Sequence, residues 1–397
     1  MNFWIEQSRQ SGKNLFTMIY FDNNATTATA PQVVEAMMPY LSGSYGNPSS
    51  SHAMGLTAGD AVATAREQVA ELLNADPSEI FFTSGGTEAD NWAVFGGFGS
   101  RPQHNHVITT KVEHEAVRNS CHTLEQSGAR VTRVDVDRDG LIDLSDLKRA
   151  LTKKTAIVSI MMANNETGVL FPVEEIADVV KGNSDALFHV DAVNAAGKIK
   201  IDLAAPGIDL LSISGHKFHG PKGTGALFIR RGVAIKPYLI GGGQERAARA
   251  GTEAVHQIVA LGAAARLATD LTLMEWVRSL RDRLENGILD MIPNASLNGT
   301  ADRSLRLPNT SNISFENTNG EAILARLDDI GVCVSTGSAC NSDSHAASPV
   351  LQAMNVPYSR AMGSIRFSLG RYNSEDEVDL VLEKLPGIVE SLRALAG

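Results

Sequence analysis

The stretches that decide the fold are Leu187-Phe188-His189-Val190-Asp191 and Leu210-Leu211-Ser212-Ile213-Ser214, the second followed at once by Gly215-His216-Lys217. Each is a short run rich in apolar and β-branched residues, which is typical of a buried strand. In an open parallel sheet, side chains at the carboxyl ends of the strands converge on one crevice. We therefore expect Asp191 and Lys217 to meet at one ligand, with a plain salt bridge between them as the alternative.

The same pattern continues on both sides of these stretches. Apolar residues at helical spacing lie between the strand-like runs, for example at 65–73 and 173–180. The predicted strands are 80–83, 107–110, 131–136, 156–162, 187–191, 210–214 and 226–229. Because strands alternate with helices, the sequence predicts an α/β fold whose mostly parallel central sheet is covered by helices on both faces.

The pattern changes near residue 271, and 397 residues exceed what one hydrophobic core usually fills. The later elements are predicted helices at 276–284 and 321–327, strands at 312–315, 332–335 and 365–369, and a closing helix from about 375. Ser374 and Glu377 form a capping-box pattern ahead of that helix. We expect a disordered or frayed extension over 1–18, a large domain over 19–270 and a smaller α+β domain over 271–397.

Composition excludes several classes of protein. With 35 Lys and Arg against 45 Asp and Glu, the net charge of −10 argues against nucleic acid as a partner. No apolar run approaches the roughly 20 residues that span a membrane, and the first residues lack the apolar core of an export signal. The three cysteines, Cys121, Cys333 and Cys340, form no CxxC pair, so we expect a cytoplasmic protein without a disulfide framework or a metal site.

A third segment carries chemistry of its own. In Phe81-Phe82-Thr83-Ser84-Gly85-Gly86-Thr87-Glu88, a strand ends in small residues and opens a helix. Free N–H groups at such a helix start bind anions, although an ordinary helix cap is the alternative. Three requirements of pyridoxal phosphate then coincide: an anion cradle, a lysine for the Schiff base at Lys217, and a carboxylate for the pyridine nitrogen at Asp191.

From about Tyr20 to its end the chain resembles the cysteine desulfurases of the NifS/IscS type. The blocks that carry the resemblance are Asp22-Asn23-Asn24-Ala25-Thr26-Thr27, Gly46-Asn47-Pro48-Ser49-Ser50, Ala163-Asn164-Asn165-Glu166-Thr167-Gly168, Ser214-Gly215-His216-Lys217, Gly243-Gln244-Glu245-Arg246 with Ala250-Gly251-Thr252-Glu253, and Gly337-Ser338-Ala339-Cys340. The resemblance implies a homodimeric pyridoxal-phosphate enzyme of fold type I. Such an enzyme takes sulfur from L-cysteine and leaves L-alanine.

The resemblance also implies roles for single residues. Lys217 would bind the cofactor, Asp191 its pyridine nitrogen, and His114 would stack on its ring and move protons. The phosphate would be held by Gly86, Thr87, Ser214 and His216, with Thr252 reaching it from the partner subunit. Asn165 would lie near a cofactor oxygen and the substrate carboxylate, which Arg366 would clamp. Taken singly, His114 could merely cap a helix, Asn165 could form a turn, and Arg366 could be a surface charge.

One cofactor-binding position departs from the family. Asn194 stands where many relatives have Gln, and its shorter side chain puts in doubt a direct hydrogen bond to the phenolic oxygen of the cofactor. We still expect Asn194 to contribute to the cofactor site.

The sulfur chemistry requires a reactive thiol. Cys340 lies in a small, polar stretch at 337–345 that is typical of an exposed, flexible loop, whereas Cys333 has apolar neighbours and Cys121 lies in a helical stretch, so both of these are expected to be structural. The Cys340 thiolate would attack the substrate sulfur and keep it as a persulfide. The acceptor implied by the resemblance is an iron–sulfur scaffold protein of the NifU/IscU type; nitrogenase maturation and general supply both stay open.

Two other readings stay open from the residues. An aminotransferase or a selenocysteine lyase would use the same cofactor. A non-catalytic scaffold or a calcium-binding module would not, and residues 135–146 match most of an EF-hand loop. Asp146 replaces the bidentate Glu of that loop and a strand-like stretch precedes it, so a strand, an acidic turn and a helix cap are favoured.

Overall fold

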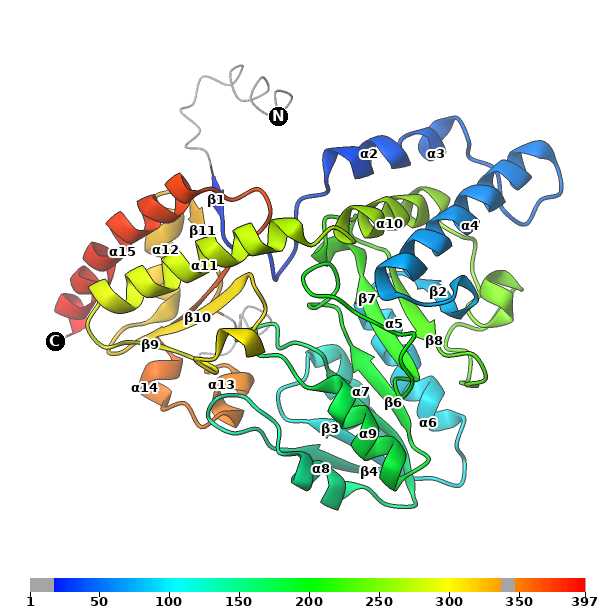
Figure 1. The fold of residues 1–397 in the computed structure, drawn as a ribbon, viewed down its shortest axis with the longest axis horizontal. Helices are drawn as coiled ribbons and strands as arrows, with labels where there is room; N and C mark the ends of the chain where they lie inside the picture. The colour runs from blue at the N-terminus through cyan, green and yellow to red at the C-terminus, as the bar shows by residue number, and fades with distance from the viewer. Residues whose placement is uncertain (1–17, 337–346, 397) are drawn as a thin grey trace.

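The computed structural model describes residues 18–336 and 347–396, which form two units around separate cores (Figure 1). The predicted N-terminal extension, apart from Met18, and the whole stretch around Cys340 lie outside the described residues. Met18 is exposed and immediately precedes the first strand. The larger unit holds the predicted sheet, and the smaller one lies beside it.

The larger unit is built on a seven-stranded sheet of order β2-β8-β7-β6-β5-β3-β4 within the described residues. Its strands are β2 (Ile80–Thr83), β3 (His106–Thr110), β4 (Arg130–Val134), β5 (Thr155–Met161), β6 (Leu187–Asp191), β7 (Leu210–Ser214) and β8 (Gly225–Ile229). Only β8 runs antiparallel to its neighbours, β2 and β7. The predicted mostly parallel sheet is therefore confirmed, with strand limits that agree to within two residues.

Helices cover both faces because successive side chains of a strand point to opposite sides. In β5, Ile157 packs into one core and Val158 into another; Leu210 and Leu211 of β7 divide in the same way. The helices of this unit are α2 (Pro31–Met37), α3 (Pro39–Ser42), α4 (Ala53–Leu73), α5 (Gly86–Asn91), α6 (Gly97–Gly99), α7 (Glu115–Gln126), α8 (Leu144–Ala150), α9 (Val173–Asn183) and α10 (Val255–Ala268).

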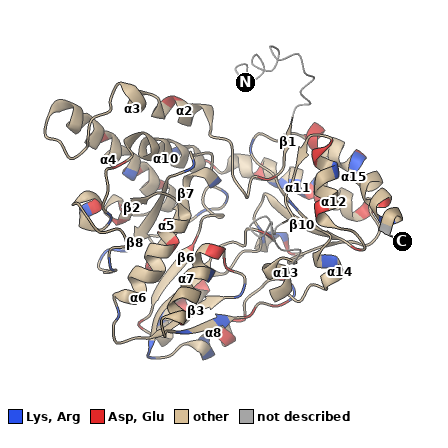
Figure 2. Ribbon diagram, turned by 180° about the vertical axis from the view of Figure 1, so that it is seen from behind, with Lys and Arg blue, Asp and Glu red and all other residues tan. Residues whose placement is uncertain are grey.

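The smaller unit has an antiparallel sheet of order β12-β10-β9. Its elements are α11 (Thr272–Met291), β9 (Ala295–Leu297), β10 (Thr310–Phe315), α12 (Gly320–Asp328), β11 (Val332–Cys333), β12 (Ser364–Ser368) and α15 (Glu375–Ala396). Two short helices of the same part of the chain, α13 (Pro349–Ala353) and α14 (Tyr358–Ala361), instead pack into the core of the larger unit. The capping box before α15 is present, since Ser374 N donates to Glu377 Oε2 at 3.1 Å and Glu377 N to Ser374 Oγ at 3.4 Å. Figure 2 shows charged residues of both signs on α11, α12 and α15.

The start of the chain belongs spatially to this smaller unit. Strand β1 (Ile19–Tyr20) pairs in parallel with β11, and Ile19 and Phe21 are buried in the same core as residues of α11, β10 and α15. The first strand of the predicted 19–270 domain thus packs against the predicted 271–397 domain. The chain enters the smaller unit, crosses to build the larger one, and returns.

The structure also shows how the EF-hand-like stretch and two of the cysteines are placed. Asp137 Oδ1 accepts hydrogen bonds from Asp139 N and Leu141 N, and Asp143 caps α8, so the EF-hand-like stretch is an acidic turn and a helix cap. The described residues contain no His, Cys, Asp and Glu group suited to a metal. Cys121 is buried as expected, whereas Cys333 is only half-buried, because β11 is an edge strand of a two-stranded pair. Within the described ranges, no helix has the length and apolar character needed to cross a bilayer.

Candidate active site

A cavity of about 320 Å³ opens at the carboxyl ends of β5, β6 and β7, where it meets the start of α5 and strand β12 of the smaller unit. Ten predicted site residues line it: Gly86, Thr87, His114, Asn165, Asp191, Asn194, Ser214, His216, Lys217 and Arg366. Thr252 is exposed and lies outside this lining, and Cys340 lies outside the described residues. The structure therefore brings together all but these two of the predicted residues.

Asp191 and Lys217 line the same cavity, as expected from the two strands that they end or follow. Asp191 is the last residue of β6, and Lys217 ends a short 3₁₀ helix, Gly215–Lys217, that begins where β7 stops. Lys217 Nζ donates to the backbone oxygens of Asn24 at 2.5 Å and Ala25 at 3.0 Å. The start of the chain thus fixes the lysine, and the strand ends bring it to the same cavity as Asp191.

Asp191 is a buried carboxylate at the floor of the cavity. Its Oδ1 accepts the Val193 N–H at 2.9 Å. Burial raises the pKa of this carboxyl, and the nearby His114 and Lys217 oppose that rise. Glu113 is buried near it, and burial raises the pKa of Glu113 to about 8. The protonated Glu113 leaves Asp191 as the better site for a negative charge in this part of the cavity.

His114 performs two roles at once. It caps α7, because its Nδ1 accepts the Ala116 N–H at 3.2 Å, and its ring also lines the cavity. Burial lowers the pKa of His114, so the ring is neutral near pH 7. A neutral ring that accepts at Nδ1 carries its proton on Nε2. Capping α7 was considered as an alternative to a functional role for His114. The cap instead selects the tautomer of the ring that faces the cavity.

The anion cradle requires a glycine. A Cβ at position 86 would lie 2.6 Å from Val193 Cγ2, so glycine lets the start of α5 pack closely against the segment that follows β6. The first N–H groups of a helix have no partner within it, and those of Gly86 and Thr87 open this one. Burial lowers the pKa of His216, which also lines the cavity, to about 4, so it acts as a neutral hydrogen-bonding group.

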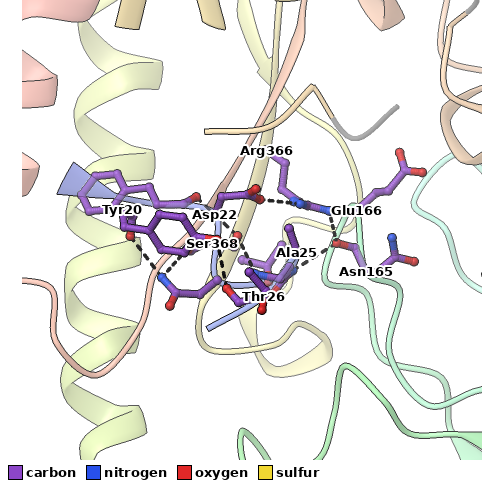
Figure 3. A network of polar contacts seen from close by, with 12 residues as sticks. Tyr20, Asp22, Ala25, Thr26, Asn165, Glu166, Arg366 and Ser368 are labelled. Carbon is purple, nitrogen blue, oxygen red and sulfur yellow. Dashed lines mark hydrogen bonds and ion pairs between the residues drawn. The ribbon is translucent and has the colours of Figure 1, made fainter. Parts of the chain in front are cut away.

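Arg366 is almost fully buried, so the alternative of a surface charge is wrong. Its Nη2 lies 2.6 Å from Asp22 Oδ1, and its Nη1 donates to the backbone oxygen of Asn165 at 3.1 Å (Figure 3). The backbone of Arg366 is held by two hydrogen bonds to the backbone of Ser335. The guanidinium is therefore held on two sides, with its Nε left without a hydrogen bond among the described residues.

A family model described as aminotransferase class V matches residues 19–381. The chain is 54% identical over 382 residues to a cysteine desulfurase of Trichormus azollae, covering 96% of this chain and 95% of that one. A solved NifS-like protein superposes with a TM-score of 0.88 at 39% identity, covering 94% of this chain and 100% of the other. A structure described as SspA in complex with cysteine gives 0.80 at 35%, covering 90% and 100%.

The chain belongs to the cysteine desulfurases of the class-V aminotransferase family. Members of this family depend on pyridoxal phosphate, and the residues present fit that group. The open N–H groups at the start of α5 suit an anion, and Asp191 is a buried carboxylate without an ion pair among the described residues. A protonated pyridine nitrogen is the kind of partner that such a carboxylate requires.

Sequence reasoning missed two groups that shape this desulfurase site. Asp22 and Asn24 were quoted as part of the family block, yet neither was given a role; Asp22 pairs with Arg366, and Asn24 lines the cavity. Lys198 was not singled out at all, although it is buried beside Asn194. The available signal was an apolar neighbourhood around a lysine that closely follows a strand end, which is weak on its own.

Proposed function

We propose that this chain uses pyridoxal phosphate to remove sulfur from L-cysteine, releasing L-alanine and leaving the sulfur as a persulfide on Cys340. The observation that carries the proposal is one cavity in which a lysine, a buried carboxylate and a helix start converge, at Lys217, Asp191 and Gly86. The kinship with cysteine desulfurases supports L-cysteine as the substrate.

The cofactor would be held from several sides. Lys217 would carry it, Asp191 would face its pyridine nitrogen, and His114 would lie against its ring. The N–H groups of Gly86 and Thr87 would receive the phosphate. The cofactor, when bound, supplies an electron sink for the electron pair left on the substrate when its α-proton departs.

The phosphate has further proposed partners. Ser214 and His216 line the same cavity as Gly86 and support this assignment. Thr252 is exposed in the single chain and would reach the phosphate of the partner subunit in a homodimer. Asn194 would contribute to the opposite end of the cofactor.

The substrate would be oriented by its carboxylate. Arg366 and Asn165 would bind that group, and the fixed guanidinium supports a defined orientation. The amine of Lys217 would take the α-proton. His114 would offer its Nε2–H to the cavity, because its Nδ1 is used in the cap of α7.

Cys340 would act as the sulfur acceptor. Its thiolate would attack the substrate sulfur, and the new S–S bond would form as the Cβ–S bond breaks. The electron pair would stay on the carbon fragment, which becomes alanine once it takes up protons, so no external oxidant is needed. The other cysteines fit this role poorly, because burial raises the pKa of Cys121 to about 12 and also raises that of Cys333.

A homodimer is proposed on the basis of exposed apolar side chains. Six of them lie between α2 and the first turn of α4: Val34, Met38, Leu41, Tyr45, Met54 and Leu56. The segment before Thr252 adds Ile240, which is 91% exposed in the single chain. Apolar surface gathered in this way is typical of an interface, and light scattering should give the mass of two chains.

The remaining assignments are also proposals. An iron–sulfur scaffold protein would accept the sulfur, in nitrogenase maturation or in general supply. A cytoplasmic location fits three cysteines without a CxxC pair. We place the domain boundary near residue 270, and β1 contributes to the core of the smaller domain.

The test uses the purified chain loaded with pyridoxal phosphate. We expect a visible absorption band, alanine in step with cysteine consumed, and a mass increase of about 32 daltons, one sulfur atom, on a peptide containing Cys340. Lys217→Ala should lose the bound band, whereas Lys222→Ala, a change to an exposed lysine nearby, should keep it. Cys340→Ala should keep the band and lose the persulfide, and Cys333→Ser should keep both.

Two results would overturn the proposal. A wild-type protein that forms alanine while Cys340 never gains sulfur would reject the acceptor. Formation of a keto acid in place of alanine would indicate transamination.

A further inference from the structure

Lys198 carries a buried amine that the proposed reaction does not use. It lies seven residues after β6 ends, and only 7% of its surface is exposed. Its Nζ donates to Asn24 Oδ1 at 3.1 Å and to Asn194 Oδ1 at 3.2 Å, and no carboxylate of the described residues forms an ion pair with it. Burial, and then the positive charges of Lys217 and Arg366, hold its pKa well below the usual range. Burying an amine without an ion-pair partner costs free energy, which suggests that Lys198 has a function.

The direction of the hydrogen bond between Lys198 and Asn24 is fixed by a backbone carbonyl. Asn24 Nδ2 donates to the backbone oxygen of Asn165 at 3.1 Å, and a carbonyl can only accept. Asn24 Oδ1 therefore faces the other way, where it also receives Asn309 Nδ2 at 3.0 Å. Lys198 must donate to Asn24 Oδ1.

The orientation of Asn194 follows instead from the donors of Lys198. Whether the Lys198 amine is charged or neutral, it has at least two N–H groups, one for Asn24 and one for Asn194. Asn194 Oδ1 is thus turned toward Lys198. The Asn194 Nδ2 group has no hydrogen bond within the described part of the chain, and the residue lines the cavity together with Lys217.

We propose that Lys198 is a positioning residue: it holds the Asn194 amide so that the NH₂ group, and not the oxygen, faces the cofactor. The inference rests on the proposed function, since the acceptor would be the phenolic oxygen of pyridoxal phosphate. A hydrogen bond donated to an oxygen stabilises its ionised form. Lys198 would thereby secure a donor at a position where the side chain is one methylene shorter than the Gln of many relatives.

A second, simpler role for Lys198 would be its charge alone. The groups that face this region carry charges of both signs: Lys217 and Arg366 are cations, Asp191 is an acid, and His114 and His216 are neutral at pH 7. Removing a cation would shift any titration nearby whether or not Asn194 is present. A positioning role, by contrast, requires Asn194, and a double-mutant cycle separates the two.

The experiment measures the pH midpoint of the visible band of the holoenzyme, together with its dissociation constant for pyridoxal phosphate. Asn194→Ala and Lys198→Met should each raise the midpoint by about one pH unit, the effect of a lost tenfold preference for the ionised oxygen. In the Asn194→Ala background, Lys198→Met should add no further shift. Lys198→Arg, which keeps donors, should stay nearer the wild type, and Lys200→Met, at an exposed lysine of the same segment, should change nothing.

Each contrary result overturns the inference. An unchanged midpoint in folded Lys198→Met refutes it, and so does an equal shift in both backgrounds, which would indicate charge alone. If Lys198→Met does not fold, Asn194→Asp is the deciding variant. Its carboxylate keeps the contact with Lys198 but has no N–H group. An unchanged midpoint in Asn194→Asp would refute the proposed orientation of the Asn194 amide. A wild type that binds no pyridoxal phosphate would overturn the proposed function and this inference together, whereas a bound band insensitive to these changes overturns the inference alone.

Discussion

Asp22→Asn is the sharpest test of how the carboxylate site is held. Asp22 Oδ1 lies 2.6 Å from Arg366 Nη2, and the side chains are 20% and 5% exposed. The guanidinium has one other hydrogen bond among the described residues, to the backbone oxygen of Asn165 (Figure 3). The asparagine keeps the shape and an acceptor oxygen but removes the charge. Arg366 should therefore lose its orientation more than its location.

The magnitude follows from the type of bond that is lost. A hydrogen bond to a charged partner contributes about 1.5–3 kcal/mol, and a neutral one about 0.5–1.5 kcal/mol. The difference of about 1–2 kcal/mol corresponds to a factor of about five to thirty in an equilibrium. Because Arg366 would bind the substrate carboxylate and not the reacting atoms, this factor should appear as a higher KM for L-cysteine, with kcat changed less than about threefold.

The assay is steady-state alanine formation by the loaded enzyme at several cysteine concentrations. Asp379→Asn is the matched control, because Asp379 pairs with Arg283 at 2.5 Å on the surface and does not line the cavity. It should leave KM unchanged. A KM for Asp22→Asn within twofold of the wild type would refute the reasoning, and a lower KM would show that Asp22 competes with the substrate for Arg366.

Two further predictions rest on buried groups of the same cavity region. Gly86→Ala should fold but bind pyridoxal phosphate at least tenfold more weakly, because its Cβ would lie 2.6 Å from Val193 Cγ2; an unchanged dissociation constant would contradict this. Burial raises the pKa of Glu113 to about 8, above the ordinary value of about 4.5 that it regains on unfolding, so stability should fall as the pH rises through that window. Glu113→Gln should flatten the fall of the melting temperature between about pH 5 and 8, while the exposed Glu275→Gln should not; equal slopes for Glu113→Gln and wild type would count against the buried proton.

Much of the site could be predicted from local patterns. Asp191 ends one strand and Lys217 closely follows another, and both strands can be recognised from their own residues. Parallel strands bring their carboxyl ends to one edge of the sheet. Gly86 and Thr87 stand where a strand gives way to a helix, and that local context already indicates an anion site. The resemblance to the family then implied roles for His114, Asn165 and Arg366.

Other features could not be predicted, because their partners lie far away along the chain. Asp22 and Arg366 are 344 positions apart, and Lys198 and Asn24 are 174 apart. No local periodicity reports such pairs. Lysine side chains are usually exposed, so the residue type of Lys198 gave no reason to expect it in a buried site.

The sequence by itself determined the alternation of strands and helices, the residues at the strand ends and the glycine of the cradle, since these depend on neighbours within a few positions. The tertiary structure alone decided which nitrogen of His114 carries the proton, which way the Asn194 amide faces, and what holds Arg366 in place. Those properties arise from hydrogen bonds between buried groups that only the packed chain brings within 3 Å or so of one another.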